Sequence, residues 1–146
     1  MSDEPTAPLD LSVLEALSKR GRTHSLVGSV SLLEDEAGRT TLSFRLDPDR
    51  YPPSVEAAVI RWRWYTNGDY RIHYREEWID EIGWKCRWDR HPHTHGTPRL
   101  HFQEPPEGNG EPVSDPIGET PPMKMFSRTM ASIHKRIVTL WEETTE

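Results

Sequence analysis

The sequence has little of what defines several large classes of protein. It holds a single cysteine, Cys86, among 146 residues, so neither an internal disulfide framework nor a cysteine-rich zinc site is expected. Cys86 alternates with Trp84 and Trp88 and is expected to be a small buried group. No apolar run approaches the ~20 residues of a membrane-spanning helix, and the acidic N-terminus lacks the features of a secretory signal. We expect a cytoplasmic protein without membrane contact.

Familiar catalytic motifs are missing as well. The chain contains no GxxxxGK[ST], GxGxxG, GxSxG or HExxH pattern. Nucleotide hydrolases, dinucleotide-dependent enzymes, serine hydrolases and zincins therefore lose their usual support. With 34% hydrophobic and 29% charged residues, the composition is that of an ordinary globular domain.

Positive charge is scarce overall but is concentrated in the centre of the chain. The formal net charge of −6 argues against nonspecific binding of duplex, because proteins that neutralise many phosphates are usually basic. Residues 1–60 carry 6 basic and 10 acidic side chains, residues 61–103 carry 8 and 6, and residues 104–146 carry 4 and 8. The centre is therefore a mildly basic island between acidic flanks.

Two helices are predicted, one near each end of the chain. Capping signals at Asp10 or Ser12 start a short N-terminal helix, and Gly21 suits the left-handed residue that ends it. Near the C-terminus, apolar residues recur at alternating spacings of three and four, which predicts an amphipathic helix to about Trp141 that covers one face of a sheet. Its apolar stripe consists of Met123, Phe126, Met130, Ile133, Ile137 and Leu140.

The region between the helices is predicted to form strands. Alternating patterns indicate a hairpin over residues 25–46, a second hairpin over 55–78, and strands at 84–89 and 99–103. The predicted fold class is α+β: an antiparallel meander sheet of five or six strands, with the N-terminal helix and the C-terminal helix beside it.

The second hairpin carries the strongest turn signal, Asn67-Gly68. A two-residue turn there would pair Arg63 with Ile72 on one face of the sheet and Trp64 with Arg71 on the other. Both faces would then mix rings with cations. We therefore expect part of this surface to be a cleft or to be covered by another element.

Three units are expected along the chain. Residues 1–103 form the helix and sheet domain, and residues 104–122, with six prolines and three glycines, form a flexible tether. Residues 123–146 form the C-terminal helix, which packs on the same domain or docks on a partner chain. A homodimer is one such partner arrangement.

Most residues with recognition chemistry lie between residues 61 and 102. This segment holds five of six tryptophans, three of four tyrosines and five of seven histidines. Aromatic rings can stack on bases, and interleaved guanidinium groups can clamp phosphates. The residues expected to bind nucleic acid are Arg61, Trp62, Arg63, Trp64, Arg71, His73, Tyr74, Arg75 and Arg87. In the competing interpretation the tryptophans are the core of a small sheet, and we expect them to divide about evenly between core and surface.

A cluster of histidines follows the predicted strand at 84–89. RNA cleavage without a metal needs a base, an acid, and a cation for the developing charge on phosphorus. The candidate catalytic residues are His91, His93, His95, His101, Arg90 and Arg99. They predict a ribonuclease, whereas a noncatalytic module that binds single-stranded nucleic acid or protein is the alternative.

The same histidines also fit a metal site. His91, His93 and His95 occupy every second position, so their rings would point the same way in an extended segment and could converge on one ion. No cofactor is predicted by the ribonuclease interpretation. A divalent metal such as zinc is the cofactor of this metalloprotein alternative.

The segment WKCRWDRHPHTHGTPRLHF, residues 84–102, follows a hairpin of alternating aromatic and basic residues. In this it resembles the TumE type of small toxin–antitoxin proteins, which have a meandering sheet, an Arg-Tyr/Trp-Asp strand and a loop dense in His and Pro. It also looks like a group of uncharacterised archaeal proteins with a Trp-Asp-Arg-His-Pro strand end. The resemblance covers roughly residues 39–104, and both predicted helices lie outside it.

The resemblance implies a function and a partner. A toxin–antitoxin-like protein of this type would act on RNA and would bind a small partner protein, an antitoxin encoded nearby. The functional edge implied by the resemblance consists of Trp88, Asp89, His91, His93, His95 and His101.

Overall fold

The structure is a computed structural model that describes residues 7–34, 38–80, 83–90, 100–103, 113–114 and 121–144. For residues 90, 100–103 and 113–114 it describes the backbone alone.

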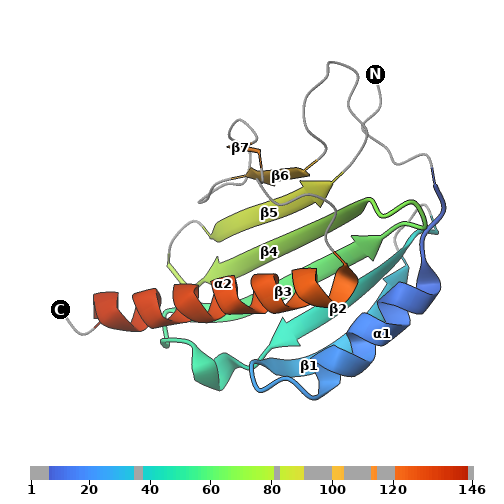
Figure 1. The fold of residues 1–146 in the computed structure, drawn as a ribbon. Helices are drawn as coiled ribbons and strands as arrows, with labels where there is room; N and C mark the ends of the chain where they lie inside the picture. Colours follow the sequence, from blue (N-terminus) through green and yellow to red (C-terminus); the bar gives the residue numbers. More distant parts are fainter. Residues whose placement is uncertain are drawn as a thin grey trace.

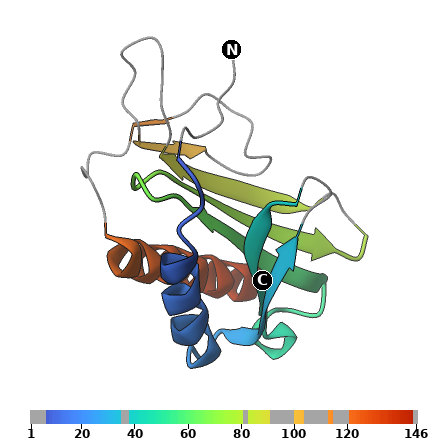
Figure 2. The same ribbon diagram turned by 90° about the vertical axis from the view of Figure 1, so that its right-hand side faces the viewer.

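The described residues form a single antiparallel sheet of seven strands in chain order. The strands are β1 Val27–Glu34, β2 Thr40–Leu46, β3 Val55–Trp64, β4 Tyr70–Trp78, β5 Trp84–Arg90, β6 Leu100–Gln103 and β7 Val113–Ser114, and a 3₁₀ turn, η1, spans Pro48–Arg50. The two helices, α1 Leu11–Arg22 and α2 Pro122–Thr144, lie on the same side of the sheet (Figures 1 and 2). Neither described helix is long and apolar enough to span a membrane. The predicted α+β meander with two helices is confirmed.

The sheet extends further along the chain than the pattern predicted. The two-residue strand β7 pairs with β6 and falls inside the segment expected to be a flexible tether. Residues 104–112 and 115–120 of that segment lie outside the described residues, and its last residue, Pro122, begins α2. The division into three units therefore stays a prediction. Helix α2 packs on the sheet of its own chain, as the first of its two predicted arrangements requires.

Helix α1 begins as the sequence predicts, because the Asp10 side chain accepts a hydrogen bond from the amide of Val13 at 3.1 Å. The predicted role of Gly21 is wrong. It has no positive φ and lies within the helix, which ends at Arg22. A Cβ on Gly21 would come 2.5 Å from the ring of Phe44. This glycine therefore allows the helix to approach the sheet closely.

Helix α2 buries its predicted stripe with one exception. Phe126 stacks on Trp62 of β3, with ring centroids 5.8 Å apart and planes 19° from parallel. Met123, in the first turn of the helix, is 38% exposed, whereas Met125 is fully buried beside Phe126. The remaining residues of the stripe are buried as predicted: Met130, Ile133, Ile137 and Leu140.

The predicted register of the second hairpin is wrong by one residue. The loop holds three residues, 66–68, rather than Asn67-Gly68 alone. The amide of Tyr65 donates to the carbonyl of Asp69 at 2.8 Å, and Gly68 has a φ of 88°. A three-residue loop that ends in a left-handed glycine is a common hairpin connection.

The observed register separates rings from cations. On the helix side Trp62 lies opposite Ile72 and Trp64 opposite Tyr70, and these four side chains are buried. On the other side Arg61 lies opposite His73, and Arg63 opposite Arg71. Since the side-chain period of a strand is two, a slip of one residue moves one partner of every pair to the opposite face. The expectation that both faces mix rings with cations is therefore wrong.

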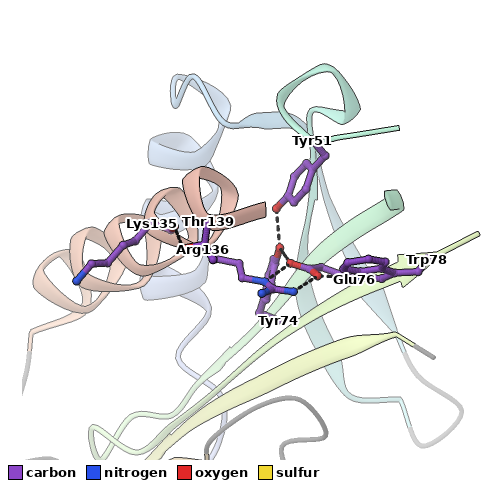
Figure 3. Close-up of polar contacts among 7 residues, drawn as sticks. All are labelled: Tyr51, Tyr74, Glu76, Trp78, Lys135, Arg136 and Thr139. Atoms are coloured by element: carbon purple, nitrogen blue, oxygen red, sulfur yellow. Dashed lines mark hydrogen bonds and ion pairs between the residues drawn. The ribbon is translucent and has the colours of Figure 1, made fainter. Parts of the chain in front are cut away.

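A buried polar network attaches α2 to the sheet on the helix side (Figure 3). The carboxylate of Glu76, on β4, is fully buried and accepts four hydrogen bonds. Arg136 of α2 donates two of them, each at 3.0 Å, and Tyr74 and Trp78 donate one each, at 2.8 and 3.0 Å. The Arg136 guanidinium also lies 3.8 Å from the centre of the Trp84 ring. Because every partner is fixed, the network sets the position of α2 along the sheet.

We predict that Arg136→Ala destabilises the fold by about 3–5 kcal/mol, because it leaves the buried carboxylate of Glu76 without its cation. Urea unfolding would measure the loss. Lys135→Ala is the matched control, since Lys135 is the neighbouring residue of α2 and its ammonium points away from the network (Figure 3). Equal unfolding free energies for the two variants would contradict a structural role for the pair.

Candidate functional site

The face of the sheet opposite the described helices carries rows of basic side chains. The central row runs across four strands from Ser43 through Arg61 and His73 to Arg87. A second row consists of Arg63, Arg71 and Asp89, and a third of Arg45, Val59, Arg75 and Lys85. We call these three rows the cationic face. Neighbouring strands lie about 4.8 Å apart, so side chains within a row are close enough to contact one ligand.

The basic residues far outnumber the acidic residues in these rows. Asp89 is the acidic member, and its buried carboxylate lies 2.7 Å from Nε of Arg87. Nε of Arg63 donates to the hydroxyl of Thr41 on β2 at 3.0 Å, which orients its guanidinium group. Several like charges on one face repel one another, and a bound anion would relieve that repulsion.

The cationic face is hollowed into a cavity of about 410 Å³. Figure 2 shows that β1 and β2 turn away from the direction of β4 and β5, so the sheet curves strongly. The cavity lining consists of Leu33, Glu34, Thr41, Arg61, Arg63, Arg71, His73 and Arg87. Four guanidinium groups around one cavity form a suitable site for phosphate or carboxylate, because each presents a planar fork of donors.

His73 is the titratable group most strongly affected by this arrangement. Burial, and then the positive charges of Lys85, Arg87, Arg75 and Arg61, lower its pKa from 6.5 to about 4. The imidazole is therefore neutral at pH 7, although it lies among cations. A neutral imidazole can accept a proton or a hydrogen bond from a ligand in the cavity.

The predicted nucleic-acid residues divide between the two faces. Arg61, Arg63, Arg71, His73 and Arg87 line the cavity, and Arg75 lies in the third row. In contrast, Trp62, Trp64 and Tyr74 are buried on the helix side, with 0%, 3% and 1% exposure. Their rings are not available to stack on bases.

The expected even division of the tryptophans between core and surface is wrong as well. Trp62, Trp64 and Trp88 are buried, and Trp78 and Trp84 pack against the same core from its edge. Each alternates along its strand with outward-facing polar residues, so the observed register places all five on the helix side.

Cys86 is buried as expected. Its burial, and then the charge of Glu76, raise the thiol pKa to about 12, so it is an unreactive core residue.

The structure describes only part of the predicted catalytic loop. His91, His93, His95 and Arg99 lie outside the described residues, and Arg90 and His101 are described as backbone alone. The backbone register pairs Asp89 with His101 and Arg90 with Leu100. The connection between β5 and β6 therefore starts and ends beside the second row of the cationic face.

The metal alternative stays a prediction. Within residues 7–34, 38–80, 83–90 and 121–144, no group of three or more His, Cys, Asp or Glu side chains could hold an ion. The three histidines that suggested a metal site are outside these ranges.

Two groups of residues on the cationic face or around its cavity were not identified from the sequence. Arg45 and Lys85 belong to the third row, and each lies between two apolar residues along its strand, a signal that could have found them. Leu33, Glu34 and Thr41 reach the cavity from β1 and β2. Their contribution depends on the curvature of the sheet, and no local pattern reveals it.

Comparison with known proteins gives one match. A family model described as Toxin TumE matches residues 15–141, which includes most of both helices. The match is longer than the resemblance noted for residues 39–104 and extends into both helices. No curated protein and no solved structure matches the chain.

We predict that the His73 imidazole titrates at a pH of about 4 in the free protein, well below 6.5. Lys85→Ala should move that pKa upward, because it removes one of the charges that disfavour the imidazolium. Side-chain ¹⁵N NMR over a pH series would measure both values, with Lys135→Ala as the control on the helix side. A wild-type pKa near 6.5 would contradict a buried imidazole surrounded by positive charges.

Proposed function

The chain belongs to the TumE toxin family, and we propose that it acts on RNA, with the cationic face as the surface that binds the RNA backbone. The proposed partner is an antitoxin, because a toxin of this kind requires a protein that neutralises it. The proposed substrate is single-stranded or locally opened RNA rather than a long duplex.

One observation carries this proposal: four guanidinium groups and a neutral imidazole surround one cavity in a chain of net charge −6. A protein that is acidic overall has no general attraction for polyanions. The cations of the cavity come from three neighbouring strands, β3, β4 and β5, and they converge only because the sheet folds as it does. Such convergence is typical of a specific site for anionic groups.

The size and chemistry of the cavity favour a nucleic-acid backbone as its ligand. A volume of about 410 Å³ can admit a phosphodiester with part of its nucleotide, whereas a duplex is much wider than the cavity. Guanidinium forks bind phosphate oxygens in pairs. Because Trp62 and Trp64 are buried, phosphate contacts rather than ring stacking on the hairpin must supply most of the affinity.

The backbone pairing at the two ends of the histidine-rich segment supports an active site at the same edge. Residues 91–99 connect Arg90 to Leu100, which are paired in the register. The adjacent pair, Asp89 and His101, continues the row that contains Arg63 and Arg71. The candidate catalytic residues His91, His93, His95, His101, Arg90 and Arg99 belong to this segment or to the strand residues at its two ends, and they remain part of this proposal.

We predict that Arg61→Ala weakens binding of a short single-stranded RNA about 10-fold at moderate salt, since a charged hydrogen bond contributes about 1.5–3 kcal/mol. Loss of one phosphate contact should also reduce the slope of log K against log salt by about 0.7. Fluorescence anisotropy at several salt concentrations would measure both effects.

Arg22→Ala is the matched control, because Arg22 is an exposed arginine at the end of α1 on the helix side. It should bind RNA as the wild-type protein does. Equal affinity and equal salt slope for Arg61→Ala and Arg22→Ala would rule out the cationic face as the RNA surface. Growth arrest on expression of the wild-type protein, relieved by Arg61→Ala, would connect the surface to toxicity.

A further inference from the structure

We propose that His73 is a catalytic residue, whose imidazole accepts the proton of an RNA 2′-hydroxyl while the neighbouring phosphodiester is cleaved. This inference rests on the proposed function and adds a reaction and a base to it. The sequence pattern assigned His73 to binding alone and placed catalysis in residues 90–101.

His73 occupies a central position on the cationic face. His73 lies in the central row, directly opposite Arg61 on β3 and Arg87 on β5. Side chains that face each other across neighbouring strands have Cβ atoms about 5 Å apart. A phosphodiester held by these two guanidinium groups would therefore lie over the His73 ring, within reach of a hydrogen bond.

The charged groups around His73 control its protonation. The charged groups that face His73 are Arg61 and Arg63 on β3, Arg71 and Arg75 on β4, Lys85, Arg87 and Asp89 on β5, and Glu34 on β1. The excess of positive charge keeps the free imidazole neutral, which leaves it able to accept a proton but lowers its strength as a base. A phosphodiester in the cavity brings negative charge close to the ring and so raises its pKa. Substrate binding thus makes the ring a better base at the moment of reaction.

Two other residues that line the cavity, Thr41 and Glu34, carry oxygen atoms that can accept a proton. Thr41 is already the acceptor for Arg63. Glu34 lies at the end of β1 and is exposed to solvent, and β2 and β3 separate that strand from β4 in the sheet. Among the described residues of the cavity lining, His73 is the group with the chemistry of a general base, and Glu34→Gln provides a direct comparison.

The reaction is a transesterification that needs no co-reactant. His73 takes the proton of the 2′-hydroxyl, and the 2′-oxygen forms a bond to phosphorus. The bond from phosphorus to the 5′-oxygen breaks, the electron pair leaves with that oxygen, and the oxygen takes a proton from solvent. The products are a 2′,3′-cyclic phosphate and a 5′-hydroxyl. The guanidinium groups of Arg61 and Arg87 offset the extra negative charge on phosphorus in the transition state.

The test measures cleavage of a fluorescent RNA oligonucleotide by the full-length protein. His73→Gln should lower kcat by about 10²–10⁴-fold, the usual contribution of a general base. Its affinity for the same oligonucleotide with 2′-deoxy sugars, which cannot react, should stay within about threefold of wild type. His134→Gln is the matched control, because His134 is an exposed histidine of α2 on the opposite side of the sheet.

A second measurement uses the wild-type protein alone, so it does not depend on whether the variant folds. The acid limb of kcat/KM reports the base of the free enzyme. It should therefore fall at a pH of about 4, and the product should carry a 2′,3′-cyclic phosphate. A limb near 6.5, or a linear phosphate as the first product, would overturn the assignment.

The outcomes separate the two proposals. If wild type cleaves RNA and His73→Gln cleaves it equally well, His73 is not the base, while the RNA-acting function stands. If wild type binds RNA without cleaving it, the reaction is refuted and a binding protein remains. If wild type neither binds nor cleaves RNA, the proposed function fails and the inference fails with it.

Discussion

The pairing of β3 with β4 determines which side chains of these two strands face the helices and which face the cavity. A three-residue loop, closed by Gly68 with its positive φ, places Trp62 opposite Ile72 and Arg61 opposite His73. With a two-residue loop the partners would shift by one position, and arginines would face the helices. The burial of Trp62 against Phe126 and the exposure of the cationic face are thus two results of one register.

The two faces of the sheet differ in how their charged side chains are paired. On the helix side, the buried Glu76 has its full set of donors from Arg136, Tyr74 and Trp78, so the polar network holds α2 in a single position. On the other side, positive charges stand close together with Asp89 as the acidic member of their rows. A rigid helix side holds the strands in place, and this lets the opposite face keep like charges near one another. The repulsion that remains is available to favour an anionic ligand.

The family match and the geometry contribute different information. The match over residues 15–141 identifies a toxin family, and a fold can support many activities. The cavity, the four guanidinium groups that line it and the neutral His73 are features of the site itself. They are the observations on which the proposed action on RNA rests.

The sequence by itself determined the elements, since strand alternation, the capping side chain at Asp10 and the apolar stripe from Phe126 are local patterns that reflect local backbone geometry. It also identified the four arginines that line the cavity. Tertiary structure decided which face each residue occupies, because the length of the loop before Asp69 is set by hydrogen bonds across the strands. It also decided that Gly21 is a contact rather than a helix end, and that Thr41 and Glu34 reach the cavity. These features depend on the curvature of the whole sheet and on close approach between distant segments, which no local pattern encodes.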